Sequence, residues 1–317
     1  MIHRLVCATI SVAALCGASS SAQAPDAAQS PFQLKSIGPG VFAAIDLGGK
    51  AGSNAGFIIG DDGVVVVDSF SNVDAAKALL AAIRKETPKP VRYVVNTHYH
   101  YDHVGGDAVF AEAGATIIAH QNVHAWIKTE NPNLFGGKLT PAQQARLDAF
   151  VEPNLTIDKD MTIWLGARRV DVRYEKGHTG GDLVVSIPDA DAMFCGDLLW
   201  RKFSPNVIDG TISDWIATDA SFEKVPDAAK VSYVPGHGDV ASLADVGDAK
   251  TYLIALRDLT AAARKKGLKG EALIAEVLPR MKEKYGTWTA FNNFAPKEIG
   301  FMEDELNGKK RTPKPVP

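Results

Sequence analysis

Apolar residues along this chain fall into short continuous runs and helical stripes. Runs rich in β-branched and aromatic residues predict strands, and apolar residues spaced three and four apart predict helices. In 74–85, Ala75, Leu79 and Ile83 share one face, and Pro88 marks the end of the helix. Strands and helices alternate in the first half, which favours a sheet covered by helices. We predict strands at 41–45, 55–59, 64–67, 91–95, 116–119, 161–165, 169–174, 183–187, 192–195 and 232–235, and helices at 74–85, 108–113, 122–128, 212–224, 242–266, 270–284 and 296–306.

The pattern loosens between Glu130 and Pro153, where prolines and glycines surround one short helix that starts after Thr140. A loosely patterned segment of this length either lies over an active site, as a lid or substrate wall, or is a plain surface excursion. The sequence leaves both possibilities open.

Four potential metal ligands lie within six residues, directly after the buried strand 91–95. Three of the eight histidines crowd this loop, so a merely solvated turn explains it poorly. Zn²⁺ accepts imidazole nitrogen and carboxylate oxygen at about 2.0–2.2 Å. In an extended segment the first two histidines project to the same side and suit one ion, whereas the other two side chains point differently and suit a second. The four residues are His98, His100, Asp102 and His103.

Length and charge narrow the class of protein. The chain has 317 residues, 46% of them hydrophobic and 22% charged, which is ample for a large core. Because α/β folds of this size often form one unit, we expect a single domain over 37–310. The net charge of −3 supplies no basic field for nucleic acid or an anionic membrane. We therefore expect no nucleic-acid partner.

The first 24 residues have the composition of a secretory signal peptide. A short positive start precedes an apolar run from Leu5 to Gly17, which is too short to span a bilayer, and a small-residue stretch follows. Pro25 hinders cleavage after Ala24, so Ala22 is an equally good end of the leader. We expect a periplasmic or secreted protein with no membrane span.

The mature chain then begins with a flexible tether over 25–36 and ends with a tail over 311–317. Cys16 raises a lipoprotein alternative, but the Leu15 before it is bulkier than that motif normally accepts. Once the leader is removed, Cys195 is the single cysteine, and it cannot form an intramolecular disulfide.

Three further polar residues stand where a predicted strand stops, and each lies beside glycines that let backbone or ions approach closely. Each one alone is typical of a turn residue. Together with the first cluster they indicate a metal site. They are His178, Asp197 and His237.

The ordered set of these seven residues resembles the metallo-β-lactamase superfamily of zinc hydrolases, over a stretch from about Gly38 to His237. The resemblance implies an αββα sandwich of two similar halves with a dinuclear zinc site at one edge of the sheets. It further implies that Asp68, at the end of 64–67, supports the histidine loop from behind. By the same resemblance, His98, His100 and His178 hold the first Zn²⁺, Asp102, His103 and His237 hold the second, and Asp197 bridges them.

Two cations about 3.5–4 Å apart can share a water, lower its pKa towards about 7 and deliver a metal-bound hydroxide. By the family pattern Asp102 orients this nucleophile towards a small ester, lactone or β-lactam carbonyl. The resembling β-lactamases place a cysteine where Asp197 stands and a substrate-gripping lysine where Trp200 stands. The Asp197 bridge resembles instead hydroxyacylglutathione hydrolases, lactonases and related esterases.

Other interpretations stay open. Diiron oxidoreductases of the same fold usually carry glutamate where His100 stands, so His100 favours zinc, although iron or manganese stays possible. Mononuclear iron oxidoreductases and a non-hydrolytic metal-binding accessory protein of periplasmic sulfur or electron-transfer metabolism are the alternatives. The oligomeric state is unknown from these residues. We expect the substrate pocket to be walled by the loop around Asn54, by 130–153, and by Trp200, Arg201, Lys202 and Asn206.

Overall fold

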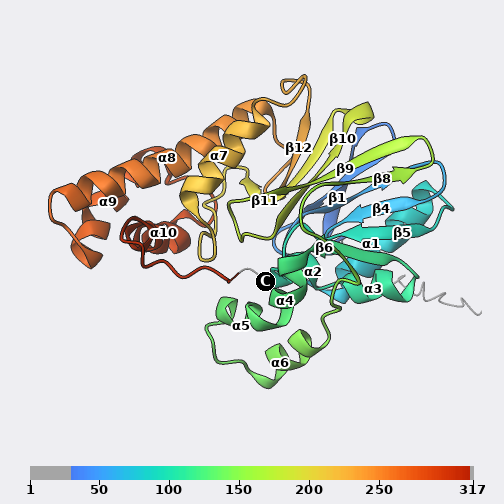
Figure 1. Ribbon diagram of the computed structural model, residues 1–317, viewed down its shortest axis with the longest axis horizontal. Coiled ribbons are helices and arrows are strands. Elements are labelled where there is room, and N and C mark those ends of the chain that lie inside the picture. The colour runs from blue at the N-terminus through green and yellow to red at the C-terminus, as the bar shows by residue number, and fades with distance from the viewer. Residues whose placement is uncertain (1–29, 315–317) are drawn as a thin grey trace, which may run out of the picture.

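A computed structural model describes residues 30–314 (Figure 1). The predicted signal peptide, the first five residues of the predicted tether and the last three residues of the chain lie outside the described part. Within residues 30–314, no helix combines the length and apolarity that a membrane span requires. Two β-sheets dominate the structure, one of seven strands in the order β1-β2-β3-β4-β5-β6-β7 and one of five in the order β12-β11-β10-β9-β8.

The seven-stranded sheet belongs to the first half of the chain, and β4, β5, β6 and β7 run parallel in it. Its strands are β1 (Phe32–Gly38), β2 (Val41–Asp46), β3 (Ala55–Ile59), β4 (Val64–Val67), β5 (Val91–Val95), β6 (Thr116–His120) and β7 (Leu155–Ile157). The helices between them are α1 (Val73–Glu86), α2 (Tyr101–Val104), α3 (Asp107–Glu112), α4 (Gln121–Thr129), α5 (Asn131–Leu134) and α6 (Pro141–Asp148).

The second half forms the five-stranded sheet and a layer of long helices. Its strands are β8 (Met161–Leu165), β9 (Arg168–Glu175), β10 (Asp182–Ile187), β11 (Ala192–Trp200) and β12 (Ser232–His237), with a short 3₁₀ turn η1 (Pro188–Ala190). The helices are α7 (Ile212–Phe222), α8 (Leu243–Lys265), α9 (Gly270–Tyr285) and α10 (Phe291–Leu306).

The two sheets pack face to face, and helices cover both outer faces (Figure 1). Apolar side chains from both sheets, such as Val65 and Val185, fill the space between them. Leu79 and Ile83 of α1 pack with Val66 on the outer face of the first sheet. Burying such apolar surface is the main stabilising force for the layers. The structure confirms the predicted αββα sandwich.

Local sequence explains α1 well. Asn72 accepts a hydrogen bond from the backbone N–H of Ala75 at 2.9 Å, which caps the helix start, and Arg84 and Lys85 lie at the negative end of its dipole. Val64–Val67 is buried throughout, as expected for a strand covered on both faces. The loops after β4 and β5 are thereby held on rigid elements.

Several predicted boundaries differ from the structure. The predicted tether is wrong from Phe32 onward, because β1 pairs antiparallel with β2 and buries the Phe32 ring. β7 was not predicted. Helix α10 begins at Phe291 rather than at Pro296, which lies inside it. Strand β11 continues to Trp200, five residues beyond its predicted end.

Candidate metal centre

The seven predicted ligands converge at one edge of the sandwich. His98, His100, Asp102 and His103 lie in the loop after β5 and in the short helix α2. The remaining ligands come from the second sheet: His178 lies between β9 and β10, Asp197 within β11, and His237 at the end of β12. Residues separated by up to 139 positions in the chain therefore share one edge of the sandwich.

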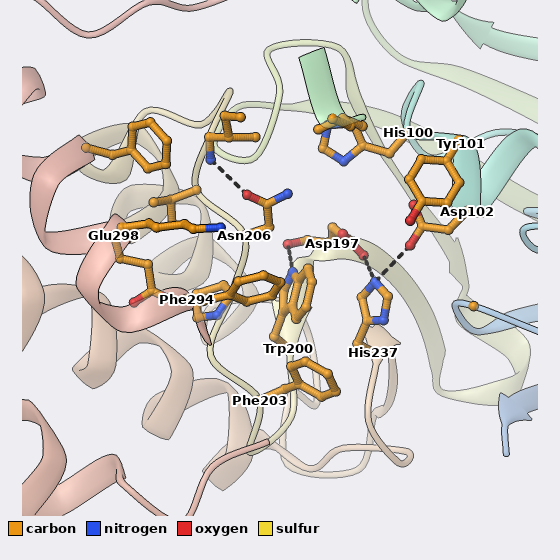
Figure 2. A pocket seen from close by; sticks show the side chains of 17 residues that line it. His100, Tyr101, Asp102, Asp197, Trp200, Phe203, Asn206, His237, Phe294 and Glu298 are labelled. Atoms are coloured by element: carbon orange, nitrogen blue, oxygen red, sulfur yellow. Dashed lines mark hydrogen bonds and ion pairs between the residues drawn. The ribbon is translucent and has the colours of Figure 1, made fainter. Parts of the chain in front are cut away.

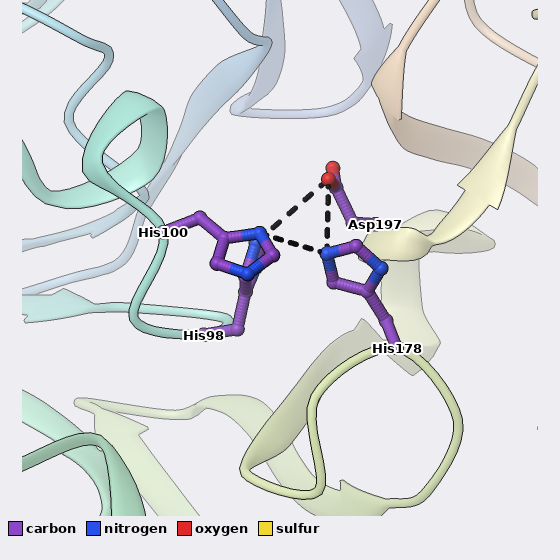
Figure 3. Close-up of side chains that lie close together, drawn as sticks. All are labelled: His98, His100, His178 and Asp197. Carbon is purple, nitrogen blue, oxygen red and sulfur yellow. Dashed lines mark hydrogen bonds and ion pairs between the residues drawn. The ribbon is translucent and has the colours of Figure 1, made fainter. Parts of the chain in front are cut away.

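The first ligand group is buried and tightly packed (Figure 3). Nε2 of His178 lies 3.0 Å from Nδ1 of His100 and 3.3 Å from Oδ2 of Asp197. Nε2 of His98 lies 3.8 Å from the same carboxylate oxygen. Three imidazole nitrogens and one carboxylate oxygen thus face a common point.

The second group adjoins the first through the other oxygen of Asp197. Nε2 of His103 lies 3.1 Å from Oδ1 of Asp197, and Nε2 of His237 lies 3.4 Å from it. Oδ2 of Asp102 lies 3.4 Å from Nε2 of His237 and 3.8 Å from Nε2 of His103. Figure 2 shows Asp197 and Asp102 on either side of the His237 ring. Two ligand sets therefore share one carboxylate.

These residues fit a divalent metal pair. Nε2 of His98, Nε2 of His103 and Oδ1 of Asp197 are buried without a hydrogen-bond partner in the described chain. Orphaned buried polar atoms are costly, and a pair of cations, one at each ligand group, would satisfy all three. The set contains only imidazole and carboxylate donors, which zinc and other divalent ions of the first transition row accept.

In the metal-free protein, the local electrostatics lower the pKa of some ligand histidines and raise the pKa of others. Burial lowers the pKa of His98 well below its ordinary value and that of His178 to about 3, so both rings are neutral and present free lone pairs. Burial also acts on His237, but the Asp197 and Asp102 carboxylates outweigh it and raise the pKa to about 9. The acidic ligands thus create a site that favours positive charge.

Carboxylates and hydroxyls behind the ligands fix the ring orientations. Oδ2 of Asp68 lies 2.8 Å from Nδ1 of His103. The Asp68 carboxylate also accepts two hydrogen bonds from Thr97, from the backbone N–H at 2.7 Å and from the hydroxyl at 2.8 Å. Asp68 therefore occupies the supporting position that the resemblance implied. Such partners set the tautomer of a ligating imidazole and raise its basicity.

A second supporting carboxylate was not predicted. Asp209 is 2% exposed, and its Oδ2 lies 3.3 Å from Nε2 of His100 and accepts a hydrogen bond from the Tyr99 hydroxyl. This contact leaves Nδ1 of His100 facing the ligand group. A single aspartate before Gly210 is typical of a turn, so the sequence carried no signal for this role.

Glycines allow the close approach of β11 to β12 and to the loop after β5. A Cβ atom on Gly236 would lie 1.8 Å from Oδ1 of Asp197, and one on Gly196 would meet Thr97 at 2.5 Å. Gly196 also has a φ of +52°, which side chains rarely adopt. The parallel pairing with β12 is irregular around Gly196, and this irregularity presents Asp197 at the site.

A cavity of about 420 Å³ opens directly onto both ligand groups (Figure 2). Trp200 of β11 and Asn206 line it, as predicted, together with Phe203 of the following loop and Phe294 and Phe301 of α10. The Asn206 amide oxygen accepts a hydrogen bond from the N–H of Ile208 at 3.1 Å, so its NH₂ group is left to face the cavity. Of the loosely patterned segment 130–153, Leu134 reaches this cavity.

The predicted pocket cations need correction. Arg201 and Lys202 do not line the cavity, because the chain turns away after Trp200. Nε of Arg201 lies 3.0 Å from Asp245 and its Nη1 lies 3.7 Å from Asp239, and Lys202 has a φ of +52° in the turn. Lys297 of α10 lines the cavity instead. It was missed because nothing local in a helix sequence shows which loop it faces.

Comparison with known proteins assigns the family. Residues 48–255 match the model of the metallo-beta-lactamase superfamily, and the chain belongs to this family. It shares 27% identity over 217 residues with a metallo-beta-lactamase type 2 of Bacillus cereus, covering 66% of this chain and 77% of that protein. A hydroxyacylglutathione hydrolase of Pelagibacter ubique is 25% identical over 176 residues, covering 51% of this chain and 64% of the relative.

A linear primary-alkylsulfatase of Pseudomonas sp. (strain ATCC 19151) is 22% identical over 275 residues, covering 71% of this chain. The match covers 52% of that relative, so the chain spans about half its length. Among solved structures, a metallo-beta-lactamase from Pontibacter korlensis aligns with a TM-score of 0.58 at 21% identity, covering 70% of this chain and 99% of the other, and shows the same fold. The protein is therefore a member of a hydrolase superfamily with a His/Asp metal site.

Proposed function

We propose that this protein is an exported dinuclear zinc hydrolase that uses a metal-activated water to attack a small ester, lactone or β-lactam carbonyl. The sharing of Asp197 between two ligand groups carries the proposal, because one carboxylate facing four imidazoles suits a pair of ions better than one. The signal-like first 24 residues support export.

Each part of the site has a distinct task. When bound, the metal pair would supply an ionised water and polarise the scissile carbonyl. Asp102 lines the cavity, so its carboxylate can hold the attacking water and accept its proton. The NH₂ group of Asn206 offers a hydrogen bond to the oxygen on which negative charge develops.

The cavity walls favour a substrate with an apolar body and an anionic group. Trp200, Phe203, Phe294 and Phe301 supply aromatic surface. Lys297 lines the same cavity, and its ammonium group has no ion pair or hydrogen bond within residues 30–314. Its neighbour Glu298 does not neutralise it, because burial raises the Glu298 pKa to about 8 and keeps that carboxyl mostly protonated at neutral pH.

Turnover of a substrate panel tests the proposal. Zinc-loaded mature protein is assayed with an aryl ester, a lactone, a chromogenic cephalosporin and an alkyl sulfate, and metal content is measured on the same sample. We expect turnover of an ester, lactone or lactam that is lost in His100→Ala and kept in His124→Ala, a control outside both ligand groups. A fully loaded protein that turns over none of these three would support the accessory role instead, and turnover of alkyl sulfate alone would replace the substrate class.

The role of Lys297 is tested with matched substrates. Lys297→Ala should raise KM for an anionic aryl ester about tenfold and leave KM for its neutral analogue nearly unchanged, whereas Lys297→Arg should keep the preference. Equal KM values for wild-type protein and Lys297→Ala with the anionic ester would contradict this assignment.

A further inference from the structure

The end of the chain returns from the helical layer to the metal centre. After α10, the described segment Lys309–Lys314 runs back across the molecule and stops beside α4 (Figure 1). The indole N–H of Trp126 in α4 donates a hydrogen bond to the Lys314 carbonyl at 2.9 Å, and Pro313 is buried. We name Lys309–Lys314 the C-terminal strap. Over residues 311–314, the packed strap differs from the loose tail predicted for this end of the chain.

Lys310 anchors the strap on the loop that follows β11. Its ammonium donates hydrogen bonds to the carbonyl of Val207 at 2.6 Å and to the carbonyl of Gly210. The Lys310 side chain is only 4% exposed. A buried ammonium on two carbonyls holds the two ends of the 207–210 loop at a fixed separation, because leaving either carbonyl or the charge unpaired would be costly.

Asp209 lies between those two carbonyls and faces the site. One of its oxygens contacts Nε2 of His100 at 3.3 Å and accepts the Tyr99 hydroxyl hydrogen bond. Its other oxygen lies 3.7 Å from Nη1 of Arg311 in the strap. Arg311 also pairs with Glu130 at the end of α4. The strap therefore contacts Asp209 directly through the Arg311 ion pair, and Lys310 holds the carbonyls of Val207 and Gly210 on either side of it.

We propose that the C-terminal strap is a positioning element for the metal centre: Lys310 and Arg311 hold Asp209 against His100, so that Nδ1 of His100 faces the first ligand group. The inference rests on the metal site of the proposed function but not on its substrate. Lys310 and Arg311 act through Asp209, and neither lines the cavity nor belongs to a ligand group.

Metal affinity and a spectroscopic signature test the strap in the full chain. Zinc affinity is measured by competition with a chelator, and the absorption spectrum of the cobalt-loaded protein reports the ligand field of each ion. Lys310→Met keeps the length of the side chain and removes the ammonium. We expect a 10- to 100-fold loss of affinity for one ion and a shifted cobalt spectrum. Lys309→Met is the matched control, because Lys309 is exposed and bonds only through its backbone in the described chain; it should match wild type.

A double-mutant cycle separates positioning from general loosening. Asp209→Asn should reproduce the loss, and Lys310→Met combined with Asp209→Asn should lose little more, since both act on one orientation. If Lys310→Met fails to fold, Arg311→Gln takes its place, because the Arg311 side chain is 58% exposed and its loss should not disturb folding. Arg311→Gln should shift the cobalt spectrum in the same direction. Additive losses, or wild-type affinity and spectrum in Arg311→Gln and Lys310→Met, would overturn the inference. A wild-type protein that binds two ions without turnover would contradict the proposed function but not the positioning role of the strap.

Discussion

The indole ring of Trp200 stacks on the imidazole of His237, with ring centroids 4.0 Å apart and planes inclined by 26°. The indole N–H also donates a hydrogen bond to the Asp197 carbonyl at 2.9 Å. One side chain at the end of β11 thus fixes a ligand from β12 and closes one wall of the cavity.

We expect Trp200→Ala to weaken binding of the ion at His237 roughly two- to tenfold, the range of an aromatic contact of this kind. Trp200→Phe keeps the stacking and should retain most of the affinity. Calorimetric titration with zinc measures both variants. Unchanged affinity in Trp200→Ala would show that the stacking does not orient His237.

Gly236→Ala places a methyl group 1.8 Å from Oδ1 of Asp197. We expect a stability loss of about 1–3 kcal/mol from overpacking and weaker binding at both metal positions, because the shared carboxylate must move. Gly300→Ala in α10 is the control, since a Cβ there meets nothing within 4 Å. It should raise stability by about 0.5–1 kcal/mol and leave metal binding unchanged. Wild-type metal affinity in Gly236→Ala would contradict the tight approach of these strands.

Asp68→Asn tests the support behind His103. Asp68 has a φ of +56°, a conformation that asparagine also tolerates, so the backbone turn should persist. The amide cannot replace both acceptor oxygens that bind Thr97 and His103, and we expect a 10- to 100-fold loss of metal affinity. Asp107→Asn alters another buried carboxyl outside both ligand groups and should bind metal normally. Equal affinities in the two variants would refute a specific role for Asp68.

Glu298 should make the folding stability depend on pH. Burial raises its pKa from 4.5 to about 8, so the folded state binds this proton more tightly than the unfolded state does. The resulting stabilisation is full below pH 4.5 and is lost as the pH rises through about 8. Ser204 donates to one carboxyl oxygen at 2.6 Å and Tyr252 contacts the other, and glutamine can keep this ring of hydrogen bonds.

Urea unfolding of metal-free wild-type protein and Glu298→Gln at pH 5, 6.5 and 8 measures this effect. We expect the wild type to lose stability relative to the variant as the pH rises, because the variant has no proton to release there. Parallel stability curves for the two proteins would show that the carboxyl titrates alike in the folded and unfolded states.

Local patterns predicted most of the fold and the polar loops. β5 is found over the predicted residues 91–95, because a β-branched run bounded by proline and asparagine carries its own signal. Phe32 and Leu34 alternate with polar residues in β1, and this alternation is typical of a strand. The proline- and serine-rich residues before it favoured a tether instead, so the strand was not predicted. The seven ligand positions were predicted from residue type and from their place after predicted strands, and the structure brings these side chains together.

The missed residues depend on contacts between distant parts of the chain. His100 and Asp209 are 109 positions apart, and Lys310 and Val207 are 103 apart. Arg201 was expected in the pocket because it follows Trp200, but which way its side chain points depends on where β11 ends, and β11 continues to Trp200. Lys297 and the strap reach the site only through the packing of α10, which no local pattern encodes.

Metal stoichiometry is the most direct test of the account. Metal-free mature protein is titrated with zinc, and bound ions are counted by elemental analysis after gel filtration. We predict two ions per chain for the wild type, fewer than two in His237→Ala, and fewer than two in His178→Ala. A wild-type protein that retains no ion, or His178→Ala and His237→Ala proteins that each still retain two, would contradict a shared dinuclear centre at Asp197.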